Sequence, residues 1–283
     1  MTIPEAALSG DLQGHILRPE PSNGWGIVVL GGSSGRVDVP RARLLASEGA
    51  VTIALRWFGG AEQVPGICEV PLEGFTVATD RLVDEGCTRI AYVGTSKGAE
   101  AALLVATGDL RLDAVVAISP SAVVWANIGP GRDGAEWPQR SSWTRNGIPL
   151  PFVPYDVGAE TTQRDGLVSY RVRHEQSMLT FAAAAAEARI PVENARAKIV
   201  LVAGGDDALW PSDTFARSMA AQLEAAGKKA VVISHPDAGH RVLLPGETTP
   251  RSSLHAHGGS DRADCELGKS AWDAIVEILH QPA

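Results

Sequence analysis

A serine stands between two glycines in the stretch Gly94-Thr-Ser-Lys-Gly98, which has the G-x-S-x-G pattern. An apolar run, residues 89–93, precedes this stretch, and a helix-prone run, residues 99–107, follows it. A serine at such a strand-to-helix turn is typical of a nucleophile elbow, a turn too tight for side chains at the two glycine positions. The positive end of the following helix lies at the same point. The pattern therefore predicts that Ser96 is a nucleophile.

A serine hydroxyl attacks an acyl carbonyl efficiently only when a base accepts its proton and a third group holds that base. Two later loops supply these groups in the chain order serine, acid, histidine, which is the order found where such an elbow joins a strand and a helix of an α/β sheet. The first loop follows Gly204 and contains Asp206 and Asp207. We favour Asp207 as the acid because it completes a G-x-x-D turn, which leaves Asp206 to cap the turn or face solvent.

The second loop contains two histidines. His240 follows the small pair Ala238-Gly239, whereas His235 comes directly after an apolar run, so His240 is the favoured base. His255 and His257 are two residues apart, but no carboxylate or cysteine shares their spacing, so a polar loop is favoured over a metal site. We expect neither a metal ion nor an organic cofactor.

The tetrahedral intermediate of such a reaction needs N–H donors where its oxyanion forms. One donor is expected to be the backbone N–H of Lys97, whose side chain should point away. The other is expected from the glycine-rich stretch 31–35, at the backbone N–H groups of Gly32 and Ser33. The alternative of a phosphate-binding loop is disfavoured because the stretch lacks both the Gly-Lys-Ser/Thr ending of a P-loop and a GxGxxG spacing.

The elements that must position these residues alternate between strand-length apolar runs and helical patterns, as in βαβ units around a mostly parallel sheet. Buried strands are expected at residues 27–30, 51–55, 90–93, 114–118, 199–202 and 230–233. Helical faces are expected at residues 75–83, 215–223 and 271–279, with Ser212 as N-cap and Gly227 as C-cap of the second helix. Because sites in open α/β sheets lie beyond the carboxyl ends of the strands, Ser96 and both loops should meet at one edge.

One segment, residues 123–181, breaks this alternation and is rich in Trp, Pro, Gly and Arg. An irregular stretch of about 60 residues inside a compact domain is usually functional or disordered, and its aromatic content argues against disorder. We therefore expect a cap over the site, inserted between the strands at 114–118 and 199–202 of a single α/β domain that spans residues 1–283.

Composition narrows the class of protein. The length of 283 residues suits one large α/β domain, and 45% of the residues are hydrophobic. The formal net charge of −8 and the lack of a long basic run argue against a nucleic-acid partner. The chain shows no apolar run long enough to span a membrane, no signal-peptide pattern and only three scattered cysteines. These features favour a cytoplasmic protein without a nucleic-acid or membrane partner, and they fit a monomer and a homodimer equally well.

With these residues identified, the chain resembles the α/β-hydrolase superfamily. More narrowly, it resembles the C-terminal catalytic domain of acyl-CoA thioester hydrolases and bile-acid-CoA:amino-acid N-acyltransferases. The stretches that carry the narrower resemblance are residues 54–59 (ALRWFG), 70–75 (VPLEGF), 94–100 (GTSKGAE), 205–212 (GDDALWPS) and 238–240 (AGH). By position, the resemblance implies an α/β-hydrolase fold and a triad of Ser96, Asp207 and His240. Shorter relatives of the dienelactone-hydrolase type share this fold.

The resemblance also bears on the reaction. Family members with a serine nucleophile tend to hydrolyse the thioester, and those with cysteine tend to transfer the acyl group to an amine. Ser96 therefore favours hydrolysis of an acyl thioester such as acyl-CoA. The alternatives are hydrolysis of a small ester or lactone, acyl transfer to a small amine or alcohol, and a non-catalytic binding protein.

Two further points qualify the resemblance. The expected cap contains a cluster of Arg164, Arg171, Arg173 and His174. A solvated charged face is favoured here over a contact for CoA phosphates, for which Arg171 and Arg173 are the candidates. The family's animal members carry a β-sandwich domain before the catalytic one, whereas the hydrolase pattern here starts within the first 30 residues.

Overall fold

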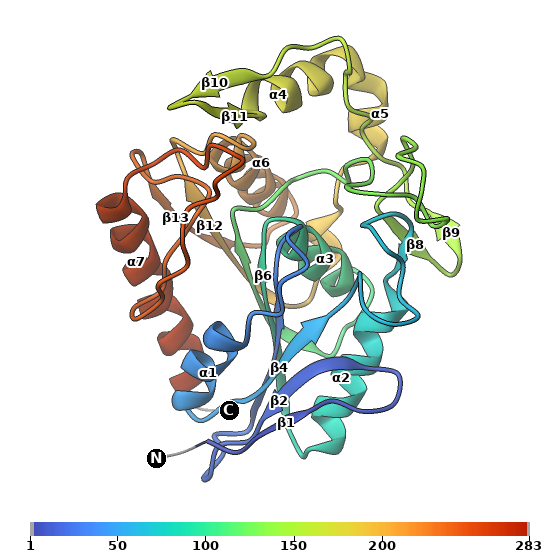
Figure 1. The fold of residues 1–283 in the computed structure, drawn as a ribbon. Coiled ribbons are helices and arrows are strands. Elements are labelled where there is room, and N and C mark those ends of the chain that lie inside the picture. The colour runs from blue at the N-terminus through green and yellow to red at the C-terminus, as the bar shows by residue number, and fades with distance from the viewer. Residues whose placement is uncertain (1–2, 282–283) are drawn as a thin grey trace.

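The structure, a computed structural model, describes residues 3–281, and within them eight strands form one sheet in the order β1-β2-β4-β3-β6-β7-β12-β13 (Figure 1). β1 and β2 are antiparallel to each other, β2 is antiparallel to β4, and the other neighbours are parallel. The predicted, mostly parallel sheet is confirmed. Its strands are β1 (Glu5–Ala7), β2 (Gln13–Leu17), β3 (Trp25–Leu30), β4 (Val51–Arg56), β6 (Arg89–Thr95), β7 (Leu112–Ile118), β12 (Lys198–Gly204) and β13 (Ala230–His235).

All six strands expected from the sequence are present, and five of them are buried. Continuous apolar runs form these strands because both faces of a parallel sheet are covered by helices. The prediction of burial is wrong for β13, in which Val231 and Val232 are each 39% exposed. β13 is the last strand of the sheet, so only one of its edges is paired.

Helices cover both faces of the sheet and enclose two apolar cores. One core contains side chains of α1 (Val39–Ser47) and α7 (Asp261–His280), and the other contains those of α2 (Glu73–Asp84), α3 (Lys97–Ala106) and α6 (Ser212–Ala225). Neighbouring residues of β3 divide between them, since Val28 faces one core and Val29 the other. This alternation is the period of two that an extended strand imposes on its side chains.

The predicted helical faces are largely correct, and their ends differ in detail. Val83 of α2 is 45% exposed, although it was expected on the buried face. Ser212 is the first residue of α6 and not its N-cap, because Pro211 occupies that position and the Ser212 hydroxyl donates to the Gly204 carbonyl (3.4 Å). Gly227 follows the helix with a φ of +73°, the left-handed conformation that ends helices at glycine.

The segment of residues 123–181 contains short strands and one mostly polar helix, which leave no clear period in the sequence. They are β8 (Trp143–Arg145), β9 (Ile148–Pro149), β10 (Thr162–Arg164), β11 (Leu167–Ser169) and α4 (Arg171–Thr180). β8 pairs with β5 (Val70–Pro71) and with β9. In Figure 1, β10, β11 and α4 form a layer above α6 and the upper ends of β12 and β13.

Two short helices, α5 (Ala182–Glu187) and η1 (Val192–Asn194), lead from this segment back to β12. No helix within residues 3–281 is both long enough and apolar enough to cross a bilayer.

Candidate active site

Ser96 occupies the turn between β6 and α3, as the motif predicts. Its φ of 57° and ψ of −119° are rare for a residue with a side chain and indicate a strained backbone. The Ser96 N–H donates to the carbonyl of Ile118 at the end of β7 (2.9 Å). This bond fixes the elbow to the neighbouring strand, and Ser96 itself is only half-buried.

The two glycines of the elbow are required by the backbone around them. A Cβ atom on Gly98 would lie 2.6 Å from the carbonyl oxygen of Leu30, and one on Gly94 would lie 2.5 Å from the carbonyl carbon of Gly98. Real Cβ atoms do not approach so closely. The elbow therefore excludes side chains at both positions, because each would meet main chain.

The expected oxyanion loop lies directly against the serine. A Cβ atom on Gly32 would lie 3.2 Å from the Cβ of Ser96 and 3.8 Å from its Oγ. Trp57 Nε1 donates to the carbonyl of Gly31 (3.3 Å) and thereby holds the loop. Lys97 is the first residue of α3, so its N–H has no partner within the helix. The structure brings Gly32 and Lys97 to Ser96, with the exposed Ser33 next in the loop.

The side chain of Lys97 points into the protein. It is fully buried, and its Nζ donates to both carboxylate oxygens of Glu100 (2.7 and 2.8 Å). Glu100 also accepts from Trp143 Nε1 (2.7 Å) and from the Trp125 N–H (3.2 Å). Both tryptophans belong to the segment 123–181, so this buried ion pair joins that segment to the elbow helix.

Asp207 and His240 lie in contact. Asp207 is fully buried, and its Oδ2 is 2.8 Å from Nδ1 of His240. An ionised carboxylate only accepts hydrogen bonds, so Nδ1 carries the proton and leaves Nε2 of the neutral ring as an acceptor. The other oxygen, Oδ1, accepts from the N–H groups of Leu209 (2.9 Å) and Trp210 (3.2 Å). These bonds orient the carboxylate toward the imidazole.

The alternative acid and base lie elsewhere. Asp206 forms two 2.6 Å bonds to the Arg164 guanidinium and accepts the Gly259 N–H (2.9 Å). The guanidinium of Arg164 lowers the pKa of the Asp206 carboxyl. Nε2 of His235 is 3.1 Å from a carboxylate oxygen of Glu266 near the surface. Asp206 thus holds the layer of β10 and β11 to the acid loop, a role that its sequence position did not reveal.

The main chain of His240 is fixed on both sides. Its N–H donates to the carbonyl of His257 (2.8 Å), and its carbonyl accepts from Oγ of Ser119 (2.9 Å). Ser119 comes directly after Ile118, which binds the N–H of Ser96. Consecutive residues at the end of β7 therefore hold the nucleophile and the base. No hydrogen bond joins Ser96 to His240 within residues 3–281, and catalytic bonds of this kind often tighten only with substrate bound.

Two further histidines, the buried His174 and the half-buried His257, stand beside the pair. His174 meets Trp210 edge-on at 5.7 Å, and Trp210 in turn meets His240 at 5.6 Å. The His257 ring lies 6.0 Å from that of His240. Burial lowers the pKa of His174 and of His257 to about 4. Both rings are therefore neutral near pH 7.

The arginines that were considered as CoA contacts have partners of their own. Arg171 donates to the carbonyls of Gly205 (3.2 Å) and Asp207 (3.0 Å), which places it on the acid loop. Arg173 donates to the carbonyl of Ala159 (3.1 Å). A contact of either side chain with CoA stays a prediction.

Two pockets lie near the site but are not lined by Ser96, Asp207 or His240. The first, of about 270 Å³, is lined by side chains that include Leu55 and Trp57. The second, of about 390 Å³, is lined by both signs of charge and by His255 and His257. Within residues 3–281, no three His, Cys, Asp or Glu side chains converge as metal ligands.

Residues 70–282 match the family model "BAAT / Acyl-CoA thioester hydrolase C terminal". Human acyl-coenzyme A thioesterase 1 is 29% identical over 290 aligned residues, which cover 98% of this chain and 65% of that protein. The human mitochondrial acyl-coenzyme A thioesterase 2 is also 29% identical, over 94% of this chain and 54% of that protein. The chain thus spans between about half and two thirds of the length of these curated relatives.

Solved structures show the same architecture at lower identity. A dienelactone hydrolase from Anabaena variabilis superposes with a TM-score of 0.54 at 15% identity, over 99% of both chains. A puromycin-hydrolyzing peptidase from Mycobacterium tuberculosis superposes with a TM-score of 0.59 at 16% identity, over 98% of this chain and 38% of that one. The fold is that of the α/β hydrolases.

Proposed function

Since the chain belongs to the BAAT / acyl-CoA thioester hydrolase C-terminal family, we propose that it hydrolyses an acyl thioester of the acyl-CoA type through an acyl-enzyme on Ser96. The observation that carries this proposal is the 2.8 Å bond between Asp207 and His240, at the sheet edge where Ser96 stands on its strained elbow. A hydrolase fold and thioesterase relatives support the reaction class.

In the proposed acylation step, Ser96 Oγ attacks the thioester carbonyl carbon while His240 Nε2 accepts the hydroxyl proton. Asp207 holds the ring in the required tautomer and stabilises the imidazolium that forms. The N–H groups of Lys97 and of Gly32 or Ser33 stabilise the oxyanion. The carbon–sulfur bond then breaks, and the leaving thiol takes its proton from His240.

Deacylation repeats the same proton transfers with water. His240 accepts a proton from a water molecule, whose oxygen attacks the acyl carbonyl of the Ser96 ester. The ester bond breaks, the proton returns to Ser96 Oγ, and a carboxylic acid leaves. The ring of Trp210 packs against His240, and the neutral His174 packs against Trp210, so these side chains limit the access of bulk water to the charges that form.

The test is thiol release from acyl-CoAs of increasing chain length, measured beside hydrolysis of nitrophenyl esters and a lactone. Loss of the nucleophile lowers turnover by roughly 10⁴- to 10⁶-fold in such enzymes, so Ser96→Ala should abolish thiol release. Ser270→Ala, at an exposed serine of α7 outside the candidate site, is the matched control. Asp207→Asn should lower turnover by about 10⁴-fold, whereas Asp206→Asn should cost far less.

Other outcomes would replace the proposal. Ester or lactone cleavage without thiol release would assign a carboxylesterase or lactonase. Thiol release that requires an added amine or alcohol would assign acyl transfer. Thiol release that survives Ser96→Ala would remove Ser96 from the mechanism, and binding of an acyl-CoA without turnover would assign a non-catalytic binding protein.

A further inference from the structure

At the glycines of the loops that carry Asp207 and His240, main chain packs directly against main chain. A Cβ atom on Gly205 would lie 2.7 Å from the carbonyl oxygen of Pro236, and one on Gly239 would lie 2.5 Å from the carbonyl carbon of Gly258. Similar clashes would follow at the other members of this glycine seam, which we define as Gly204, Gly205, Gly239, Gly258 and Gly259. The Asp206 N–H donates across the seam to the carbonyl of Ala238 (2.9 Å), and further hydrogen bonds from outside the seam hold the residues next to His240.

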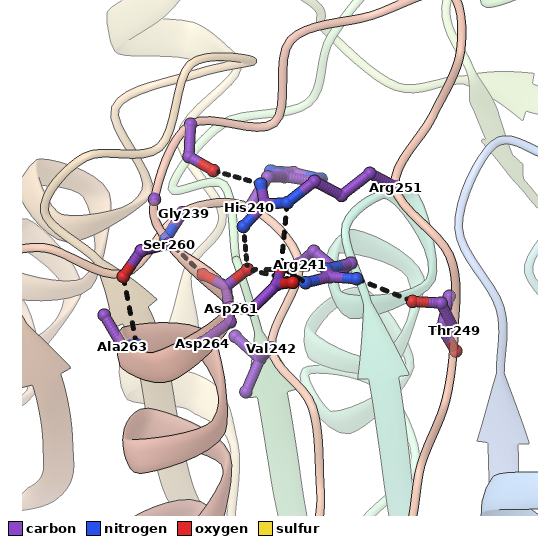
Figure 2. Close-up of polar contacts among 12 residues, drawn as sticks. Gly239, His240, Arg241, Val242, Thr249, Arg251, Ser260, Asp261, Ala263 and Asp264 are labelled. Atoms are coloured by element: carbon purple, nitrogen blue, oxygen red, sulfur yellow. Dashed lines mark hydrogen bonds and ion pairs between the residues drawn. The ribbon is translucent and has the colours of Figure 1, made fainter.

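One such bond comes from Asp264, in the first turn of α7 (Figure 2). The residue is fully buried, and its Oδ1 accepts the N–H of Gly239 at 2.8 Å. Gly239 immediately precedes His240, so the carboxylate acts on the backbone that presents the imidazole. The approach depends on Gly259, where a Cβ atom would lie 2.5 Å from Asp264 Oδ1.

The second oxygen of Asp264 faces two arginines. Arg251 lies 3.1 Å from Oδ2 and Arg241 lies 3.4 Å from it, and both also pair with the exposed Asp261. Figure 2 shows the two guanidinium groups between Asp264 and the loop that contains Thr249. These cations compensate the buried negative charge, which would otherwise be costly.

The main chain at His240 is therefore held at three points. Asp264 binds the preceding N–H, His257 accepts the N–H of His240 itself, and Ser119 donates to its carbonyl. Of these, only Asp264 binds the loop through a side-chain acceptor. Asp264 also reaches the loop from α7, which packs on the face of the sheet opposite to the one that α3 covers.

We propose that Asp264 is a positioning residue for His240. By holding Gly239 it sets the imidazole between Asp207 and Ser96, and it touches neither substrate nor the reacting atoms. Its kinetic consequence rests on the proposed function. Displacing a catalytic group by about 1 Å costs on the order of 10²-fold in rate, so loss of this anchor should lower kcat and leave KM unchanged.

The experiment separates the position of the carboxylate from its charge. Asp264→Asn keeps an acceptor at the same place and removes the charge, so we expect kcat within a few-fold of the native value. Asp264→Glu keeps the charge beside Arg241 and Arg251 but shifts the acceptor by one methylene, so we expect a 10- to 100-fold loss of kcat. Asp261→Asn, which contacts the same arginines but not Gly239, is the control and should leave kcat unchanged.

Thermal unfolding of each variant shows whether it folds. A folded Asp264→Asn protein with kcat reduced more than 10-fold would overturn the proposal in favour of a charge effect, even if Asp264→Glu does not fold. A folded Asp264→Glu protein with native kcat would overturn it as well.

The proton resonance of the His240 Nδ1–H gives a readout without substrate. We expect it to shift or broaden in Asp264→Glu and to persist in Asp264→Asn. If the native protein shows no Ser96-dependent hydrolysis, the proposed function fails while this resonance still tests the positioning. An unchanged resonance in Asp264→Glu would overturn the inference.

Discussion

His174 lies among aromatic rings and titrates far below an ordinary histidine. Its Nδ1–H donates to the carbonyl of Tyr170 (3.0 Å), and Trp125 lies edge-on to the ring at 4.6 Å. Burial lowers its pKa from 6.5 to about 4. Between these two values the unfolded chain binds more protons than the folded one, so the free energy of unfolding falls as the pH drops from 6.5 to 4.

Replacing this histidine should weaken the acid sensitivity. The shift corresponds to about 3 kcal/mol of stability that is present above pH 6.5 and lost toward pH 4. His174→Phe keeps a ring in the cluster and removes the titration, so we expect a smaller fall in stability between pH 7 and pH 4. Urea unfolding at several pH values measures this, with His280→Gln at an exposed position as control. An identical pH dependence in His174→Phe and native protein would contradict the prediction.

At the scale of residues, the sequence was sufficient to name the groups of the candidate triad but not those that support them. Ser96 and His240 stand in local motifs, and Asp207 in a turn with two adjacent acids. The contacts of Ser119 and Asp264 with the histidine loop join residues that are 121 and 25 positions apart. No local pattern marks such a contact, because it exists only once the sheet has formed.

Among the elements, the turn from β6 to α3 tolerates little change. A Cβ atom at Gly98 would lie 2.5 Å from the carbonyl oxygen of Gly31, in the loop expected to form the oxyanion hole. Gly98→Ala should therefore destabilise the protein by about 1–3 kcal/mol and reduce kcat. Chemical denaturation and esterase assays measure the two effects.

Gly74 provides the matched control for that substitution. It lies in α2, and a Cβ atom there would have no heavy atom within 4 Å. Gly74→Ala should be neutral or stabilising by up to about 1 kcal/mol. Equal effects of alanine at both positions would show that backbone contact does not explain the elbow glycines.

Elements were predictable where they are long and apolar. The six strands followed from their continuous apolar runs, and the buried faces of α2, α6 and α7 followed from the helical period of their apolar residues. α4 was not predicted because it is mostly polar and buries few of its side chains. α1 was not predicted either. The exposure of β13 was missed because an apolar run looks the same at the edge of a sheet as at its centre.

Over the whole molecule, the segment of residues 123–181 divides into two parts. Trp125, Trp143 and Val153 belong to the same apolar core as α2, α3 and α6. In the β10–β11 hairpin, β10 is exposed and β11 is half-buried. The hairpin is held by the bond from Ala256 N–H to the carbonyl of Val168, by the bond from Ser169 Oγ to the carbonyl of Ala208 (2.7 Å) and by the Arg164–Asp206 pair. We expect the lower part to unfold with the sheet and the hairpin to open separately.

Native-state hydrogen exchange tests this division. The Val153 N–H, bonded to the carbonyl of Val124, should exchange with the free energy and denaturant dependence of the amides in β7. The amides of β10 and β11 should exchange through openings of lower free energy. Exchange of Val153 together with the hairpin would show instead that the whole segment moves as one lid.

The place of this segment between β7 and β12 was evident from the sequence, since the alternation of strands and helices stops and resumes there. Its division was not, because the lower part is defined by the buried ion pair of Lys97 with Glu100 and the tryptophans that bind Glu100. A role for the segment as a cap over bound substrate stays a prediction.

The glycine seam restricts how the sequence of this fold can vary. Where two loops meet through side chains, a substitution in one loop is compensated by a substitution in the other, so the sequences of related proteins change at such pairs of positions. Gly204 and Gly239 meet as bare main chain, so no partner substitution restores what a side chain there would disrupt. Both selection in nature and laboratory evolution are therefore expected to leave the seam invariant and to alter substrate range through residues 123–181.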